Sequence, residues 1–294
     1  MISSSLPRVL VRGAGDLATG VLQSLWRAGF PLMASEVENP LAVRRTVSLC
    51  EAVYEGTAKV EDMTARRLPS LPREAEVSPD AFLWDEIDRC WKKGEIPILV
   101  DPGLQCLPAY RPQILVDATI RKKNEDLSMD LAPLVIALGS GFSAGKDCHL
   151  VIETMRGHRL GRLIFEGEAL PNTHVPGIIA GKGRERVLHA PVDGILRNRH
   201  RIGDQVQACE IISEIVVKDG RKVPVLAAIS GLLRGLLRDG TPVTQGLKLG
   251  DIDPRRDEIE NLTTISDKAR NLGGAVLTGI FALRDHWEGD PSSL

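Results

Sequence analysis

A glycine-rich turn near the start of the chain carries the residue types that bind phosphates. Residues 9–20 read VLVRGAGDLATG, an apolar strand followed by a turn and then a helical pattern. Gly13, Gly15 and Ala18 match the alanine-ending form of the dinucleotide-binding fingerprint, in which the second glycine lets backbone N–H groups approach a pyrophosphate. The N-terminus of the following helix would add partial positive charge. The turn therefore predicts a nucleotide-type ligand, with a purely structural corner as the alternative.

Charged residues after this turn extend the same hypothesis. An acid is expected about 20 residues further on, where it would accept a hydrogen bond from a ribose hydroxyl, and Glu36 and Glu38 stand there. Asp16 directly follows the second glycine and would bring a negative charge to the phosphates unless it turns away as a cap. Arg44 and Arg45 could hold a second anionic group, or could belong to an ordinary solvated surface.

A second glycine-containing stretch, LGSGFSAGKD at 138–147, also suggests an anion site. Gly139 and Gly141 would supply backbone N–H groups to an anion-binding nest, with a flexible turn as the equal alternative. The stretch is not a Walker A loop, because five residues separate Gly139 from Gly145 and Lys146 is followed by Asp147.

Ionisable side chains gather in two further places. Glu153, Arg156 and His158 form a candidate acid–base group beside the predicted pocket, with structural ion pairs as the alternative. Zinc is not predicted there, since a third ligand is missing. Asp251 and Asp253 alternate on an extended run, so both could face one way and help to hold a hydrated magnesium ion. An acidic solvated turn is the commoner explanation of this pair.

The elements that must position these residues alternate between strands and helices. Aliphatic runs IPILVD, QILVDATI and APLVIALGSG follow helical patterns at 16–28 and from Pro79 to Gly94. Near-continuous aliphatic strands suit a parallel sheet covered on both faces, with ligands at the carboxyl ends of its strands. We therefore expect an α/β protein with a Rossmann-like nucleotide-binding domain over residues 1–150.

The second half of the chain contains an internal repeat. Residues 188–212 recur at 226–249 with an offset of 37 residues, as from Gly194 to Gly231. The unit resembles the half-repeat of the biotinyl/lipoyl barrel-sandwich domain. Gly220 occupies the position of the modified lysine in that family, between Lys218 and Lys222, so neither biotin nor lipoate is expected. We predict a connecting segment at 151–186, a degenerate β-rich barrel at 187–250 and a C-terminal segment with a helix at 251–294 that packs back on the first domain.

Composition limits the partners. A net charge of −2 and an aromatic content of 4% favour neither nucleic acid nor a membrane surface. No apolar run has the length of a transmembrane helix, and no export signal is recognised. The five scattered cysteines, with no CxxC, indicate reduced thiols in the cytoplasm.

Several motifs together carry a family resemblance. The stretches RGAGDLATG, VDATIRKKN, VIETMRGHRLGR, NTHVPG and GLKLGDIDPR resemble the selenium-dependent molybdenum hydroxylase accessory family, the YqeB-like proteins, over roughly residues 8 to 282. The resemblance implies a role in maturing such a hydroxylase, which would be the partner. It also implies that Gly13, Gly15 and Glu36, with Arg44 and Arg45, hold a nucleotide-bearing cofactor such as a molybdopterin dinucleotide.

The same resemblance leaves the activity open. Cys50 lies in a matching motif and would handle sulfur or selenium, or be a buried structural cysteine. An NAD(P)-dependent oxidoreductase that uses His158 or Glu153 is the second hypothesis, and a non-catalytic docking scaffold is the third. Whether the protein is an enzyme, and whether it forms a homo-oligomer, stay open.

Overall fold

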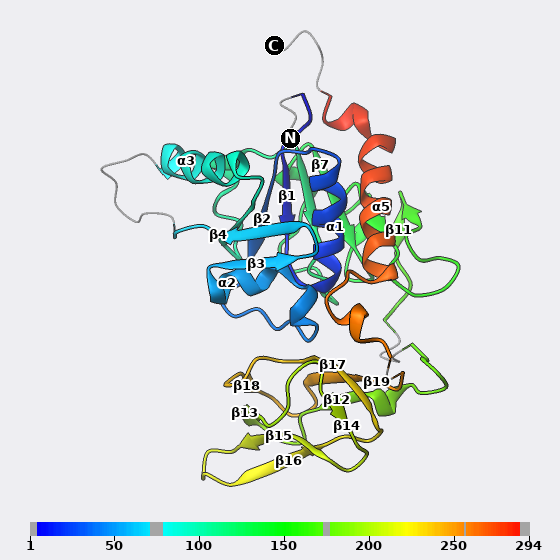
Figure 1. Ribbon diagram of the computed structural model, residues 1–294. Coiled ribbons are helices and arrows are strands. Elements are labelled where there is room, and N and C mark those ends of the chain that lie inside the picture. The colour runs from blue at the N-terminus through cyan, green and yellow to red at the C-terminus, as the bar shows by residue number, and fades with distance from the viewer. Residues whose placement is uncertain (1–4, 71–78, 173–176, 256, 289–294) are drawn as a thin grey trace. The chain divides into compact units, whose positions relative to one another are not determined.

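The computed structural model describes residues 5–70, 79–172, 177–255 and 257–288 (Figure 1). The chain forms two compact units, and both are discontinuous in sequence. The first contains Met1–Pro40, Ser48–Asn172 and Ile265–Leu294, and the second contains Leu41–Val47 and Thr173–Thr264.

The first unit is built on a nine-stranded sheet with the order β10-β9-β7-β6-β1-β2-β5-β4-β3. Neighbouring strands from β9 to β4 in that order are parallel, whereas β10 and β3 pair antiparallel at the two edges. A separate two-stranded sheet joins β8 and β11. The strands are β1 (Val9–Arg12), β2 (Leu32–Glu36), β3 (Thr57–Val60), β4 (Met63–Arg67), β5 (Ile96–Val100), β6 (Ile114–Asp117), β7 (Leu134–Leu138), β8 (Ser143–Ala144), β9 (Leu150–Ile152), β10 (Leu163–Ile164) and β11 (Gly167–Glu168).

Helices cover both faces of this sheet because its central strands are apolar on both sides. Leu10, Met33 and Leu115 form one buried cluster with Leu83 and Ile87 of α3. On α5, by contrast, Gly279 lies against Leu150 and Ile136 of the sheet. The helices are α1 (Asp16–Arg27), α2 (Ala52–Glu55), α3 (Pro79–Lys92), α4 (Leu107–Tyr110) and α5 (Asp267–Ala282).

Two helices from opposite ends of the sequence, α1 and α5, lie side by side (Figure 1). Gly20 of α1 faces Ala269, and Gly273 of α5 faces Gly20 and Ser24, so the two helices run in the same direction. Since α1 begins where β1 ends, α5 also begins at the carboxyl edge of the sheet. Two helix N-termini therefore meet at the edge where ligands bind in open α/β sheets.

The second unit consists of two four-stranded antiparallel sheets, β12-β19-β17-β14 and β16-β15-β13-β18. Its strands occur in pairs with the 37-residue offset: Gly194 begins β13 and Gly231 begins β17. Each sheet takes two strands from each half, and both contribute to one apolar core. The strands are β12 (Val187–His189), β13 (Gly194–Asn198), β14 (Gln205–Val206), β15 (Ile211–Val216), β16 (Lys222–Leu226), β17 (Gly231–Leu236), β18 (Pro242–Val243) and β19 (Lys248–Asp253).

The predicted fold class, a Rossmann-like domain followed by a biotinyl/lipoyl-like barrel, is corrected. The sheet is a large mixed one, because the hairpin of β3 and β4 and the antiparallel strand β10 extend it at both edges. These strands are short, and β3 exposes alternate residues. Such edge strands lack the continuous apolar pattern that identified the central ones. The remaining strands pair as two separate antiparallel sheets.

Candidate functional site

The two glycines of the first turn play different parts. Gly13 has φ +97°, donates a hydrogen bond to the Ser35 carbonyl at 2.8 Å, and lies so close to Ala118 that a Cβ would sit 3.4 Å from its carbonyl. Gly15 has φ −70°, and no atom lies within 4 Å of the place where its Cβ would be. The turn therefore needs Gly13 for its shape, whereas Gly15 faces open space.

Glu36, at the end of β2, is hydrogen-bonded to the backbone of the glycine turn. One carboxylate oxygen, Oε2, accepts a hydrogen bond from the Ala14 N–H at 2.8 Å, and Oε1 accepts one from the Val37 N–H at 2.8 Å. Burial raises the pKa of this carboxyl, and the two backbone hydrogen bonds act against that rise. Each oxygen keeps a second lone pair, so Glu36 can still accept a hydrogen bond from a ligand hydroxyl.

The first turn of α1 is left open. Gly15 is the N-cap residue, and no side chain caps the helix there. Ala18 is buried in the first turn, as close helix–sheet packing requires. N–H groups at the start of a helix have no partner within the helix, so these donors are available to water or to an anion.

Lys268 brings a cation to the same place. Burial lowers the pKa of its ammonium, and the charge of Arg156 lowers it further, whereas Asp16, Glu153 and Asp267 raise it. Lys268 is half-buried, and among the residues that the structure describes its ammonium has neither a hydrogen-bond nor an ion-pair partner. It lies in the first turn of α5, at the positive end of the helix dipole, where a cation is disfavoured.

Sequence reasoning missed Lys268, although a signal was present. Lys268 follows Ser266, the cap whose hydroxyl accepts a hydrogen bond from the Ala269 N–H at 3.2 Å. A lysine two residues after a helix cap interacts unfavourably with the helix dipole, and this is the signal that the sequence contains. Its proximity to the glycine turn, however, depends on the packing of α5 on α1, which no local pattern encodes.

The predicted acid–base residues Glu153, Arg156 and His158 do not converge on one point. Glu153 is 2% exposed, and its two oxygens accept hydrogen bonds from the Met155 and Leu170 N–H groups at 2.7 and 2.8 Å. Arg156 forms a two-pronged ion pair with Asp267 at 2.9 and 3.0 Å, and His158 is exposed. The charges of Glu153 and Arg156 both act on the pKa of Lys268, whereas His158 is not among the groups that shift it.

Cys50 is hydrogen-bonded through its backbone to the glycine turn. Its N–H donates to the Ala14 carbonyl at 2.8 Å, and the preceding N–H of Leu49 donates to the Thr19 hydroxyl at 3.0 Å. The residue is 1% exposed. Cys50 thus braces the turn through its backbone, with its thiol in the protein interior.

Alkylation should separate Cys50 from an exposed thiol. All five cysteines are free, and Cys209 is exposed while the other four are buried. Burial raises the pKa of Cys90 to about 11 and that of Cys148 to about 12, which suppresses their thiolates. At pH 8 iodoacetamide should add one label per native chain, at Cys209, as mass spectrometry would show. Labelling of Cys50 as fast as Cys209 would contradict its burial.

The glycines after β7 serve close packing. A Cβ on Gly141 would lie 2.2 Å from the Arg121 carbonyl oxygen, and one on Gly139 would lie 3.3 Å from the Thr154 hydroxyl. The loop is also closed by Asp147, which accepts a hydrogen bond from the Ser143 N–H at 2.9 Å. Gly139 and Gly141 therefore pack against protein atoms, unlike Gly15.

The edge of the sheet beside β6 is closed by ion pairs. Arg12 binds Asp126 at 2.6 Å and lies 3.6 Å from Asp117, while Arg121 also reaches Asp126. The hydrogen bond from Arg12 holds the pKa of Asp126 at about 2. These charges lie within ion-pair distance of one another.

Four of the predicted site residues belong to the second unit: Arg44, Arg45, Asp251 and Asp253. Arg44 donates to the carbonyls of Asn261 and Thr264 at 3.2 and 3.3 Å, and Arg45 donates to that of Leu236 at 2.8 Å. These two arginines hold backbone carbonyls of their own unit.

The predicted magnesium ligands are engaged with arginines. Asp251 pairs with Arg186 at 3.2 Å and with Arg234 at 3.4 Å, and Asp253 pairs with Arg255 at 2.8 Å. Within residues 5–70, 79–172, 177–255 and 257–288, no group of three or more His, Cys, Asp or Glu residues is arranged to hold a metal ion. In the same ranges, no helix has the length and apolarity needed to cross a membrane.

Comparison with curated proteins finds a relative with a similar sequence. No protein-family model matches. The relative is the uncharacterized protein YqeB of Escherichia coli K12, 42% identical over 275 residues, which are 94% of this chain and 47% of the relative. The chain thus spans about half the length of that protein.

Three solved structures show a low similarity to this chain. A succinylglutamate desuccinylase/aspartoacylase from Rhodobacter sphaeroides is 17% identical, with 84% of this chain and 86% of that one covered and a TM-score of 0.27. An aspartoacylase family protein from Mesorhizobium loti is 13% identical, with 84% and 85% covered and a TM-score of 0.27. The ectoine utilization protein EutE from Ruegeria pomeroyi is 12% identical, with 84% and 86% covered and a TM-score of 0.26. Scores of this size transfer no activity to this chain.

These comparisons correct the functional hypotheses drawn from the sequence. The curated relative carries no assigned function, and the solved structures are desuccinylase/aspartoacylase and ectoine utilization proteins. The comparisons give no support to the identification as a hydroxylase accessory protein, to its molybdenum cofactor role or to the oxidoreductase alternative, and these are withdrawn.

Proposed function

We propose that the first unit binds the phosphate group of a small, nucleotide-type ligand at the carboxyl edge of its sheet. The observation that carries the proposal is Lys268, a half-buried, unpartnered cation among the described residues, in the first turn of α5. The lysine supplies a positive charge for an anion. The start of α1, which has no side-chain cap, and the start of α5 each add the partial positive charge of a helix N-terminus.

The open space at Gly15 supports a ligand at this place. Backbone N–H groups of the α1 turn are approachable because no atom stands where a side chain of residue 15 would be. Glu36, which holds the turn, is placed to accept a hydrogen bond from a hydroxyl next to the phosphate. The five unbridged cysteines support a reducing, cytoplasmic compartment for such a protein.

Replacement of the lysine tests the proposal. Calorimetry with ATP, CTP, NAD, NADP and pyrophosphate should find at least one ligand that binds, and Lys268→Met should weaken its binding about tenfold to a hundredfold, the value of a charged hydrogen bond. Lys59→Met, at an exposed lysine, is the matched control and should leave the affinity unchanged. Equal affinities for native protein and Lys268→Met would remove the lysine from the site.

The same titration repeated at higher pH gives a second reading. Because burial lowers the pKa of Lys268 from the ordinary 10.5, its ammonium loses the proton at a lower pH than a free lysine does. Affinity for a fully ionised phosphate should therefore fall as the pH rises toward 10.5, and bound anion should raise the lysine pKa again. Lys268→Met should lack this alkaline decline.

A further inference from the structure

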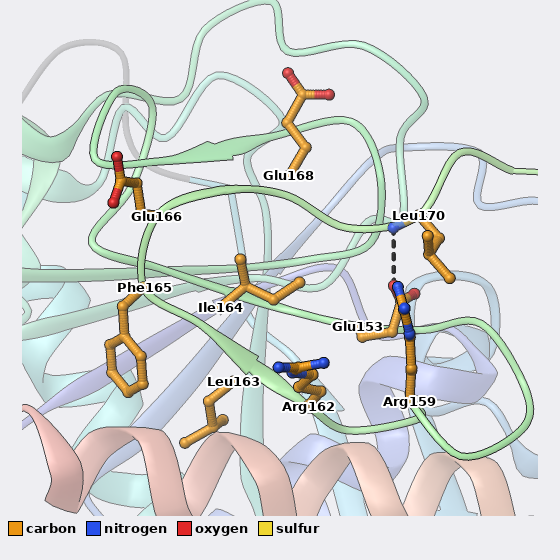
Figure 2. Close-up of a pocket in the computed structure, with 9 residues that line it drawn as sticks. All are labelled: Glu153, Arg159, Arg162, Leu163, Ile164, Phe165, Glu166, Glu168 and Leu170. Carbon is orange, nitrogen blue, oxygen red and sulfur yellow. Dashed lines mark hydrogen bonds between the residues drawn. The ribbon is translucent and has the colours of Figure 1, made fainter.

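The short strand β9 of the first unit has a titratable side chain at its start and a hollow at its end. After Ile152 the chain enters residues 153–170, which line a hollow of about 330 Å³, and Glu153 accepts a hydrogen bond there from the Leu170 N–H at 2.8 Å (Figure 2). His149 stands directly before the strand. Because β9 is three residues long, the contacts at its start matter for its attachment to the sheet.

His149 completes the backbone pairing between β9 and β7. Its own N–H donates to the Val135 carbonyl at 2.9 Å, and its ring nitrogen Nδ1 accepts a hydrogen bond from the Val135 N–H at 3.0 Å. Val135 is fully buried, and the pairing of β7 with β9 begins one residue later, at Ile136 and Leu150. The imidazole therefore satisfies a buried backbone donor, which it can do only while Nδ1 carries no proton.

A second histidine lies against the first. His286 belongs to η6 (Arg284–His286), the short turn that follows α5, and its ring meets that of His149 edge to face, with the ring centroids 4.8 Å apart. Trp287 ties the same turn to α5, since its Nε1–H donates to the Ile280 carbonyl at 2.9 Å. The two imidazoles thus join the end of α5 to the start of β9.

The surroundings of His149 favour its neutral form. Burial lowers the pKa of its imidazole from the ordinary 6.5, and a positive charge on His286 lowers it further, whereas Asp130, which precedes β7, raises it. Arg284 and Asp285, also on η6, pair with each other at 3.8 Å. Native His149 therefore takes up its proton at a lower pH than the unfolded chain does. The stability that depends on its neutral form is present above pH 6.5 and is lost as the pH falls below that value.

We infer that the ring contact between His149 and His286 is an acid-sensitive switch, which releases η6 from the start of β9 when the pH falls. Proton uptake at Nδ1 turns an acceptor into a donor, so the buried Val135 N–H loses its partner and faces a second N–H. A further proton on His286 would place two positive charges in ring contact. Because η6 lies at the opposite end of α5 from Lys268, the switch does not depend on the proposed phosphate site.

Titration of the full chain tests the switch. With ¹⁵N-labelled histidines, His149 should be unprotonated at Nδ1 at pH 8 and should titrate below pH 6.5, and its resonance is identified by its absence in His149→Asn. The Trp287 indole N–H resonance should shift with the same midpoint, because Trp287 follows η6 directly. His286→Phe keeps a ring in the contact without its charge and should raise the His149 midpoint. Titration of His149 at or above pH 6.5, or a Trp287 resonance that ignores its midpoint, would overturn the inference.

Matched variants separate the switch from general acid unfolding. Asparagine places an oxygen where Nδ1 stands and takes up no proton. At pH 5, His149→Asn should therefore keep the Val135 amide protected from hydrogen exchange, whereas the native chain should lose that protection by at least about tenfold relative to pH 8. The Leu170 amide, bonded to Glu153 at the other end of β9, should stay protected in both proteins (Figure 2). His189→Asn, at an exposed histidine of the second unit, is the control and should behave like the native chain. Equal loss of Val135 protection in native protein and His149→Asn would refute the switch.

Discussion

Gly15→Val should abolish binding of a phosphate-bearing ligand and leave the protein about as stable as the native chain. Stability should be retained because Gly15 has φ −70°, which every residue adopts, and because its Cβ position is empty to 4 Å. A change within about 1 kcal/mol is expected for such a site at a helix N-cap. Binding should be lost because the branched side chain occupies the space through which a phosphate reaches the N–H groups of α1.

The expected loss is at least about a hundredfold, equivalent to two charge-assisted hydrogen bonds. Calorimetry against the same five ligands would measure it, alongside urea denaturation for stability. Gly103→Val is a suitable control, since Gly103 follows β5 at the same edge of the sheet and has only the Gln105 side chain near its Cβ position, at 3.9 Å. If Gly15→Val binds as the native protein does, the turn is only a corner between a strand and a helix.

Local patterns predicted the parts of the fold whose signals lie within a few residues. The strand at Val9, the glycine turn and the helix from Asp16 were all expected, and the helix ends at Arg27, one residue before the expected Ala28. The aliphatic runs became β5, β6 and β7, which lie in parallel register with their neighbours. Such elements are predictable because strand burial and helix periodicity are properties of the local sequence.

Contacts between distant parts of the chain determine which charged residues lie near the glycine turn, and local patterns did not predict these contacts. Lys268 lies within electrostatic range of Asp16 because α5 packs on α1, some 250 residues earlier in the chain. The reverse happened with Arg44 and Arg45, which follow Glu36 closely in sequence but belong to the second unit and bind carbonyls there. Distance along the chain was therefore a poor guide to which charges lie near the glycine turn.

The interface of α1 with α5 gives the second large effect, on stability. A Cβ on Gly273 would lie 2.2 Å from the Gly20 carbonyl oxygen and 2.3 Å from the Ser24 hydroxyl, so Gly273→Ala must push the helices apart. We expect the gain in helix propensity, about 1 kcal/mol, to be outweighed, with a net destabilisation of about 1–3 kcal/mol. Gly274 has nothing within 4 Å of its Cβ position, so Gly274→Ala should stabilise the protein by about 0.5–1 kcal/mol.

Adjacent glycines with opposite expected signs make a strict comparison, because both substitutions change the unfolded chain equally. All four tryptophans, Trp26, Trp84, Trp91 and Trp287, lie in the first unit, so urea denaturation followed by tryptophan fluorescence reports on that unit. Gly273→Ala should also weaken phosphate binding, since separation of the helices moves Lys268 away from the start of α1, whereas Gly274→Ala should bind normally. Two stabilised variants would refute the close helix contact, and lost stability with unchanged binding would separate Lys268 from the α1 turn.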